Sequence, residues 1–353
     1  MSTTPFELGV TTFVETYPDP STGALTSHGD RLRQVVEEAQ AAEAAGLDIY
    51  GVGEHHREDF AASAPAVVLG VIAGSTRSIR LTSAVTVLSS DDPVRVFQDF
   101  ATLDQMSSGR AEVIAGRGSF TESFPLFGYD LADYDELFAE KLDLLVALRD
   151  SERVTWSGTH RSALHDHAVY PRPFQDALPV WVGVGGNPQS VVRTASYGLP
   201  MALAIIGGEP ARFAPFADLH RRALAEFGKP HAPIAVHAHG YVGDATRAAA
   251  DEFFPPYRVA MSHIGRERGW GPISRASFDA SSSPEGSLFV GDPGLVADKI
   301  VATARTLGLE RFMLHVSVGT LPHEKVLRAI ELLGTEVAPL VREAMADFSA
   351  VGR

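Results

Sequence analysis

Three consecutive residues, Glu54, His55 and His56, carry side chains suited to proton transfer. A histidine whose pKa lies near neutrality gives or takes a proton readily at physiological pH. Adjacent residues of an extended segment point in opposite directions, so His55 and His56 seldom bind one metal ion together. The segment therefore offers acid or base groups, and its two histidines are not expected to share one metal ion.

A glycine-rich segment, GVGGNPQS at 183–190, leads from a predicted strand into a predicted helix. Glycines let the backbone approach a ligand closely, and free N–H groups at a helix start attract a phosphate. The segment is not a full GxGxxG, and no acidic residue follows at the ~20-residue distance of dinucleotide folds. We expect it to bind one phosphate with help from the Ser190 hydroxyl; the alternative is that its glycines serve only the geometry of the turn.

Arg117 lies between two glycines, in the segment AGRGSF. A guanidinium fork matches a phosphate, and flanking glycines keep the path to it open. The alternative is a surface salt bridge. Arg117 follows the fourth predicted strand and the glycine-rich segment follows the fifth, so we expect the two to be neighbours.

His237 and His239 are two residues apart and therefore share one face of a strand. With His315 and Glu54 they offer the ligands of a metal-dependent barrel hydrolase. We favour the other interpretation, in which these histidines line a pocket inside a barrel. The chain has no cysteine, which excludes disulfides, thiolate nucleophiles and Cys-based metal sites.

Short apolar segments with helical patterns between most of them must position these residues. Eight strands that alternate with helices indicate a closed parallel (β/α)8 TIM barrel, whose active site lies at the C-terminal ends of the strands. The unusual residues follow six such ends. The predicted strands are 6–11, 48–52, 79–85, 111–115, 180–184, 201–206, 234–241 and 311–316.

Helical spacing predicts helices over 31–45, 93–106 and 139–148, and Pro339 is expected to break or kink the last helix. Two long insertions follow strands 4 and 7, at 118–178 and 243–292, and we expect them to form lids and pocket walls. The first should contain a helix and then irregular or hairpin structure. No second core is evident, so we predict one domain over 1–353.

Composition limits the class of protein. The 353 residues are 45% apolar with a formal net charge of -14, and acidic and basic residues are interspersed. This balance argues against a nucleic-acid or anionic-membrane surface. No apolar run approaches the ~20 residues of a membrane span, and no signal-peptide pattern is present, so we expect a cytoplasmic protein.

In its order of motifs, the chain resembles the bacterial luciferase-like flavin monooxygenases over essentially its whole length. Each motif alone is modest, but the order and spacing are specific. The motifs are EHH at 54–56, TSAV at 82–85 with PVR at 93–95, LDQMSSGR at 103–110, GRG at 116–118, GVGGN at 183–187, YGLPM at 197–201 and VGDPGLVADKI at 290–300.

The resemblance implies flavin mononucleotide (FMN) as cofactor. Arg117 matches the arginine that grips the flavin phosphate, and His55 matches a histidine near the reacting flavin and substrate. Ala84 and Val85 match a pair often joined by a cis peptide beneath the flavin ring, so we predict a cis bond there. The predicted catalytic residues are Glu54, His55 and His56, and the predicted cofactor-binding residues are Ser83, Ala84, Val85, Gly116, Arg117, Gly118, Gly183, Gly185, Gly186, Asn187 and Ser190.

The resemblance further implies that reduced FMN and O2 oxygenate a small organic substrate such as an aldehyde. Gly116 replaces a cysteine of luciferase, so light emission is not implied. Reduced flavin would come from a separate NAD(P)H:flavin reductase or from NAD(P)H bound to this chain. We expect a homodimer formed through the helices at 31–45 and 93–106. A deazaflavin cofactor, a non-catalytic flavin-binding barrel and a metal-dependent hydrolase are the alternatives.

Overall fold

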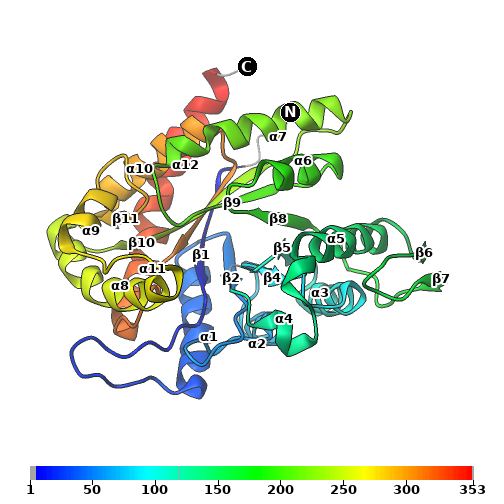
Figure 1. The fold of residues 1–353 in the computed structure, drawn as a ribbon. Helices are drawn as coiled ribbons and strands as arrows, with labels where there is room; N and C mark the ends of the chain where they lie inside the picture. The colour runs from blue at the N-terminus through cyan, green and yellow to red at the C-terminus, as the bar shows by residue number, and fades with distance from the viewer. Residues whose placement is uncertain (1–4, 119, 352–353) are drawn as a thin grey trace.

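The computed structural model describes residues 5–118 and 120–351, in which eight parallel strands close into a barrel surrounded by helices (Figure 1). All eight predicted strands are confirmed, with ends that differ by two residues at most. The barrel closes because β10 pairs with both β9 and β12. The barrel strands are β1 (Glu7–Thr12), β2 (Ile49–Val52), β3 (Arg80–Ser83), β5 (Ala111–Gly116), β8 (Val180–Val184), β9 (Met201–Ile205), β10 (Ile234–Val242) and β12 (Arg311–His315).

Helices follow the strands and cover the outside of the barrel (Figure 1). The predicted helices are confirmed, and α3 begins where the Asp92 side chain accepts a hydrogen bond from the backbone of Val94. The prediction missed α2, because its exposed Val67 and buried Leu69 do not form a single apolar stripe. The helices outside the barrel are α1 (His28–Ala44), α2 (Pro65–Ser75), α3 (Pro93–Ser107), α6 (Pro188–Ser196), α7 (Ala214–Glu226), α10 (Pro293–Leu307), α11 (His323–Leu332) and α12 (Ala338–Val351).

Both insertions contain secondary structure of their own. The first holds α4 (Ser123–Phe127), α5 (Tyr134–Asp150) and an antiparallel hairpin of β6 (Arg153–Trp156) and β7 (Leu164–Ala168), as expected. The second holds α8 (Thr246–Arg268) and α9 (Arg275–Ser281). Two short strands were not predicted, β4 (Thr86–Val87) beside β5 and β11 (Phe289–Gly291) beside β10. In the described ranges, no helix combines the length and apolar character needed to cross a membrane.

Pro339 was expected to break or kink the C-terminal helix, and the break is wrong. A π-helical turn, Leu333–Val337, leads directly into α12, which contains Pro339 near its start. Proline cannot donate a backbone hydrogen bond, and its ring crowds the preceding turn. The wider π turn gives the ring room, so the helix continues.

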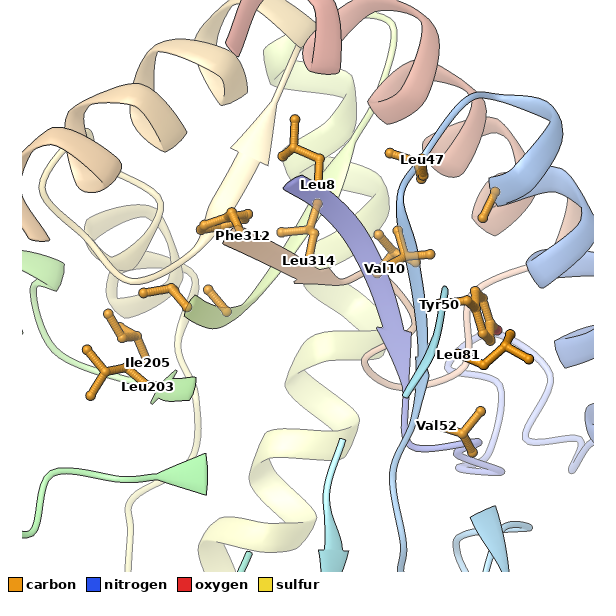
Figure 2. Packing of buried hydrophobic residues seen from close by; sticks show 14 of the residues in the cluster. Leu8, Val10, Leu47, Tyr50, Val52, Leu81, Leu203, Ile205, Phe312 and Leu314 are labelled. Carbon is orange, nitrogen blue, oxygen red and sulfur yellow. The ribbon is translucent and has the colours of Figure 1, made fainter. Parts of the chain in front are cut away.

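Alternate residues of the strands build two cores. Leu8, Val10, Phe312 and Leu314 are fully buried between the strands and the outer helices (Figure 2). Residues at the intervening positions point into the barrel, as the two-residue period of a strand requires. The inner apolar layer consists of Ile49, Ile114, Trp181, Ala202, Ala235 and Met313.

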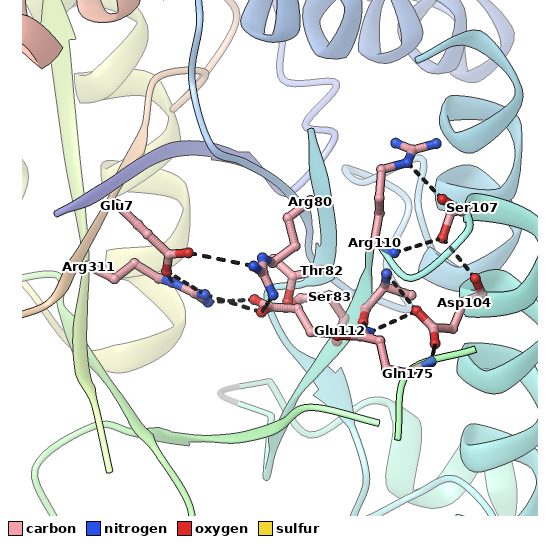
Figure 3. A network of polar contacts seen from close by, with 11 residues as sticks. Glu7, Arg80, Thr82, Ser83, Asp104, Ser107, Arg110, Glu112, Gln175 and Arg311 are labelled. Atoms are coloured by element: carbon pink, nitrogen blue, oxygen red, sulfur yellow. Dashed lines mark hydrogen bonds and ion pairs between the residues drawn. The ribbon is translucent and has the colours of Figure 1, made fainter. Parts of the chain in front are cut away.

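Buried ion pairs occupy the N-terminal end of the barrel (Figure 3). Arg311 lies 2.5 Å from a carboxylate oxygen of Glu112 and 2.8 Å from one of Glu7. Its guanidinium also stacks 4.0 Å from the ring centroid of Trp181. Glu7 and Arg311 begin their strands, so this cluster lies opposite the end where barrel enzymes place their active sites. We infer a structural role for it.

The LDQMSSGR motif is also structural (Figure 3). Asp104 accepts hydrogen bonds from the backbone of Ala111 and from both the backbone and the side chain of Gln175. Arg110 donates to the backbone carbonyls of Ala73, Thr76, Ile79 and Ser107. The motif therefore holds α2, α3 and β5 together.

Candidate active site

An open cavity of about 870 Å³ lies at the C-terminal ends of the barrel strands. We call it the rim cavity. Of the predicted site residues, it gathers Glu54, His55, Ala84, Val85, Gly116, Arg117, Gly118, Gly183 and Gly185. The other lining residues are Phe13, Val87, Tyr134, Val184, Ala204, Ile206 and His237.

Ala84 and Val85 form an apolar part of the cavity wall. The peptide bond between them is cis, which confirms the prediction made from the resemblance. The side chain of Val85 fills the space beside two glycines, Gly116 and Gly183. These two glycines therefore make room for Val85, in addition to any approach of a ligand.

Arg117 and the turn after β8 are neighbours, as predicted, because β5 and β8 pair in parallel. Arg117 Nη1 lies 2.5 Å from Asp135 Oδ1, and the guanidinium lies 5.2 Å from the centroid of the Tyr134 ring. Asp135 is mostly exposed. Arg117 thus forms the salt bridge of the alternative interpretation and also lines the cavity, while phosphate binding stays a prediction.

Some predicted cofactor-binding residues lie outside the cavity lining. The Asn187 side chain accepts from the backbone of Gln189 and begins α6, while Ser190 is buried in the first turn. The Ser83 hydroxyl bonds the backbone of Ile114 and so joins β3 to β5. Gly186, with φ +108°, follows the lining residue Gly185. Cofactor contacts of these four residues stay predictions.

Glu54 and His56 form a pair next to the rim cavity. Their closest side-chain atoms, Oε1 and Nε2, are 2.8 Å apart. The second oxygen of Glu54 accepts from the backbone of Val87, so the carboxylate is held at both oxygens. His56 does not line the rim cavity but borders a smaller one beside it.

His55 lines the rim cavity and is surrounded by aromatic rings. Its ring centroid lies 4.9 Å from that of Phe13, 4.2 Å from Phe60 and 5.1 Å from Phe120. Burial, with a smaller effect from His315, lowers the pKa of His55 to about 3. The imidazole is therefore neutral at pH 7 and a weaker base than an exposed histidine, with one ring nitrogen able to donate a hydrogen bond and the other able to accept one.

A chain of buried hydrogen bonds leads to the cavity from Glu15, which follows β1. Glu15 Oε1 lies 2.6 Å from His315 Nε2, and Thr11 Oγ1 lies 3.4 Å from His315 Nδ1 and 2.7 Å from His237 Nε2. His237 lines the cavity. The sequence interpretation missed Glu15, although an acidic residue just after a barrel strand was a usable signal.

The histidines of β10 and β12 do not form a metal site. His237, His239 and His315 do not bring three ligand atoms within 4.8 Å of one another. Across the described residues, the cluster that does so is Asp133, Glu136 and His160, in the first insertion. The geometry thus favours the interpretation of these histidines as pocket-lining residues.

A second cavity, of about 510 Å³, adjoins the first and shares Phe13 and Ile206 with it. We call it the insertion cavity, because Phe120 of the first insertion and Met261 and Ile264 of the second form part of its wall. This confirms that both insertions build pocket walls.

Comparisons with known proteins agree with this architecture. Residues 6–311 match the profile of the luciferase-like monooxygenases. The N-acetyl-S-alkylcysteine monooxygenase of Bacillus subtilis is 34% identical over 218 residues, which are 59% of this chain and 63% of that relative. The match thus spans less than two thirds of the relative's length.

Solved structures share the fold at low identity. A monooxygenase from Streptomyces bottropensis superimposes with a TM-score of 0.82 at 21% identity, covering 94% of this chain and 99% of its own. The oxygenating constituent of 3,6-diketocamphane monooxygenase from Pseudomonas putida, in complex with FMN, has a TM-score of 0.77 at 16% identity, with 95% and 98% coverage. An F420-dependent secondary alcohol dehydrogenase reaches 0.74 at 18% identity, with 96% and 99% coverage.

Proposed function

The chain belongs to the luciferase-like monooxygenase family, and from that premise we propose that it is an FMN-dependent monooxygenase. Its substrate would be a small organic molecule such as an aldehyde. The observation that carries the proposal is the rim cavity, where a cation, an open glycine turn and an apolar wall occur together. Each of these features suits one part of FMN.

The residues present fit the cofactor. Arg117 would bind the phosphate. Apart from the chain neighbours of Gly185, no atom of the described residues lies within 4 Å of a Cβ built there, so its backbone is open to a ligand. Ala84 and Val85 would support the apolar ring. The salt bridge to the exposed Asp135 is a weak competitor, because exposed ion pairs contribute little and a guanidinium has five donors.

Reduced FMN, when bound, supplies the two electrons that let one oxygen atom of O2 enter the substrate while the other leaves as water. The protein would bind and orient the cofactor and the substrate, and it would exclude bulk water from the cavity. His55, neutral and lining the cavity, would hydrogen-bond the substrate at a ring nitrogen. Its lowered pKa makes the protonated ring a strong acid, so any proton it takes up would be returned readily. Glu54 and His56, which flank His55 in the chain and pair with each other, would support this role.

Two further parts of the proposal concern the source of reduced flavin and the number of chains in the assembly. We propose that the chain works as a homodimer and receives reduced FMN from a separate NAD(P)H:flavin reductase. Stopped-flow mixing of the FMN-loaded protein with NADH and with NADPH tests the alternative, in which this chain binds the nicotinamide itself. Rapid bleaching of the flavin would show that no separate reductase is required.

The proposal is tested by supplying the purified protein with FMN, a flavin reductase, NADH and a panel of aldehydes. We expect O2 consumption that yields the carboxylic acid in a one-to-one ratio with the aldehyde consumed. FMN binding without any oxygenated product across broad substrate panels would favour the non-catalytic barrel. Activity with reduced deazaflavin and none with FMN would favour the deazaflavin alternative.

A further inference from the structure

The insertion cavity contains a buried polar group that the fold does not use. His239 on β10 lines this cavity and is only 4% exposed. Neither of its ring nitrogens has a hydrogen-bond partner within residues 5–118 and 120–351. Buried polar groups are almost always paired, and an unpaired one destabilises the folded protein. An unpaired imidazole at a cavity wall is therefore suited to a ligand.

The protonation state of His239 defines the ligand it would accept. Burial, with His315 and His237 nearby, lowers its pKa well below the ordinary value. A neutral imidazole offers one N–H donor and one acceptor nitrogen, which suit a carbonyl or hydroxyl group. The surrounding wall is mostly apolar, so burying a charged group there would be unfavourable.

We propose that the insertion cavity is the substrate site, and that His239 hydrogen-bonds the carbonyl or hydroxyl group of a neutral, ring-sized apolar molecule. This inference rests on the proposed monooxygenase function. Its wall combines mostly apolar side chains with a few polar groups such as His239, which is the lining typical of small-molecule sites. Aromatic side chains such as Phe60, Phe120 and Trp270 offer faces for a ring to pack against.

The position of the cavity agrees with this role. The ring of Phe13 forms part of both cavities and contacts the rings of His55 and His237, at centroid distances of 4.9 and 5.6 Å. A molecule in the insertion cavity would therefore lie next to the wall of the rim cavity. The His239 ring itself lies 6.3 Å from the ring of His237, which lines the rim cavity.

Carboxylates are the ligand class that this site should reject. Glu15 lines the same cavity and presents its own carboxylate, which bonds His315 and Ser317. Arg268 also borders the cavity, but it is exposed and stacks on Phe120 and Trp270 at the mouth. An acid group bound beside His239 would thus share the cavity with a like charge, whereas the exposed Arg268 guanidinium is screened by solvent.

Three fluorinated probes of similar size test the inference on the cofactor-free protein. They are 4-fluoroacetophenone, 1-ethyl-4-fluorobenzene and 4-fluorobenzoate, and their dissociation constants are measured by 19F NMR. We expect the ketone to bind about 3- to 10-fold more tightly than the hydrocarbon, as one hydrogen bond provides. The benzoate should bind most weakly, and tightest binding by the benzoate would overturn the proposal.

Two variants locate the site. His239→Leu should remove the preference for the ketone, retain hydrocarbon binding and raise the thermal unfolding midpoint, because an unpaired polar group is gone. Ile264→Trp, at a partly exposed position of α8, should fill the cavity and weaken all three probes while FMN binding is unchanged. A lower unfolding midpoint of His239→Leu, or an unchanged ketone preference, would overturn the role of His239. A wild-type protein that binds the probes but does not bind FMN would contradict the proposed function and leave the proposed site intact.

Discussion

Val85 occupies the space where a side chain at position 116 would lie, and a Cβ built on Gly116 would be 2.4 Å from Val85 Cγ2. Real Cβ atoms do not approach other atoms so closely. The first glycine of the GRG motif is therefore required by the packing of the Ala84–Val85 segment. Sequence reasoning had assigned it only to the approach of a phosphate.

Gly116→Ala should destabilise the protein by about 1–3 kcal/mol, because the added methyl group overpacks a tight contact. Gly185→Ala is the matched control, since it lines the same cavity and nothing lies within 4 Å of its Cβ position. Urea unfolding of both variants measures the difference. Equal stability of Gly116→Ala and Gly185→Ala would show that Val85 moves aside at little cost.

Arg110 should contribute strongly to stability. Arg110→Met removes hydrogen bonds to several backbone carbonyls at the ends of α2 and α3 and should cost about 2–4 kcal/mol. Arg95→Met, at an exposed position of α3, should change stability by less than about 0.5 kcal/mol. Denaturant unfolding compares the two, and similar midpoints would refute the structural role of the LDQMSSGR motif.

His237 should make the protein sensitive to acid. Burial lowers its folded-state pKa to about 3, whereas the unfolded chain binds the proton near the ordinary value of 6.5. The free energy of unfolding should therefore fall as the pH drops from 6.5 towards 3, by about 1.4 kcal/mol per pH unit from this residue. His237→Gln keeps a polar group for Thr11 but does not titrate, so its profile should be shallower by that amount. Parallel stability profiles from pH 4 to pH 7 would contradict this expectation.

The dimer interface is expected on α2 and α3. Val67 and Val71 on α2 are 69% and 57% exposed, and Met106 on α3 is 69% exposed. Of the two helices nominated from the sequence, α3 thus retains an apolar surface, while α1 exposes polar residues such as Arg33 and Glu37. Sedimentation at micromolar concentration should give about twice the 37.8 kDa chain mass. The double variant Val67→Glu with Val71→Glu should sediment as a monomer, and a monomeric wild type would refute the interface.

The strands and the residues at the rim were predictable from sequence because glycine or polar residues lie at or just after the ends of most apolar strands. Gly185, Arg117 and His55 follow this rule, and the closed barrel brings them together. The resemblance alone predicted the Ala84–Val85 cis bond, since no local pattern indicates one. Contacts between distant segments, such as Glu15 with His315, depend on strand register and were not accessible.

Ser83 illustrates the limit of inference by position. It lies at the end of a barrel strand, as a cofactor contact would, yet its hydroxyl bonds the backbone of Ile114 on the neighbouring β5. The two-residue period of a strand tells which residues share a face, but it does not tell which partner a short side chain selects. Asn187 is similar, because its amide caps α6.

Equilibrium binding of FMN and of riboflavin, followed by flavin fluorescence, tests the central claim most directly. Riboflavin lacks the phosphate that Arg117 is proposed to bind. Arg117→Ala should weaken FMN binding by about 10- to 150-fold, which corresponds to a charge-assisted contact of about 1.5–3 kcal/mol. Riboflavin binding should be unchanged, and Asp135→Asn, which releases the competing salt bridge, should not weaken FMN. Equal losses for FMN and riboflavin in Arg117→Ala, or no loss for either, would contradict the account.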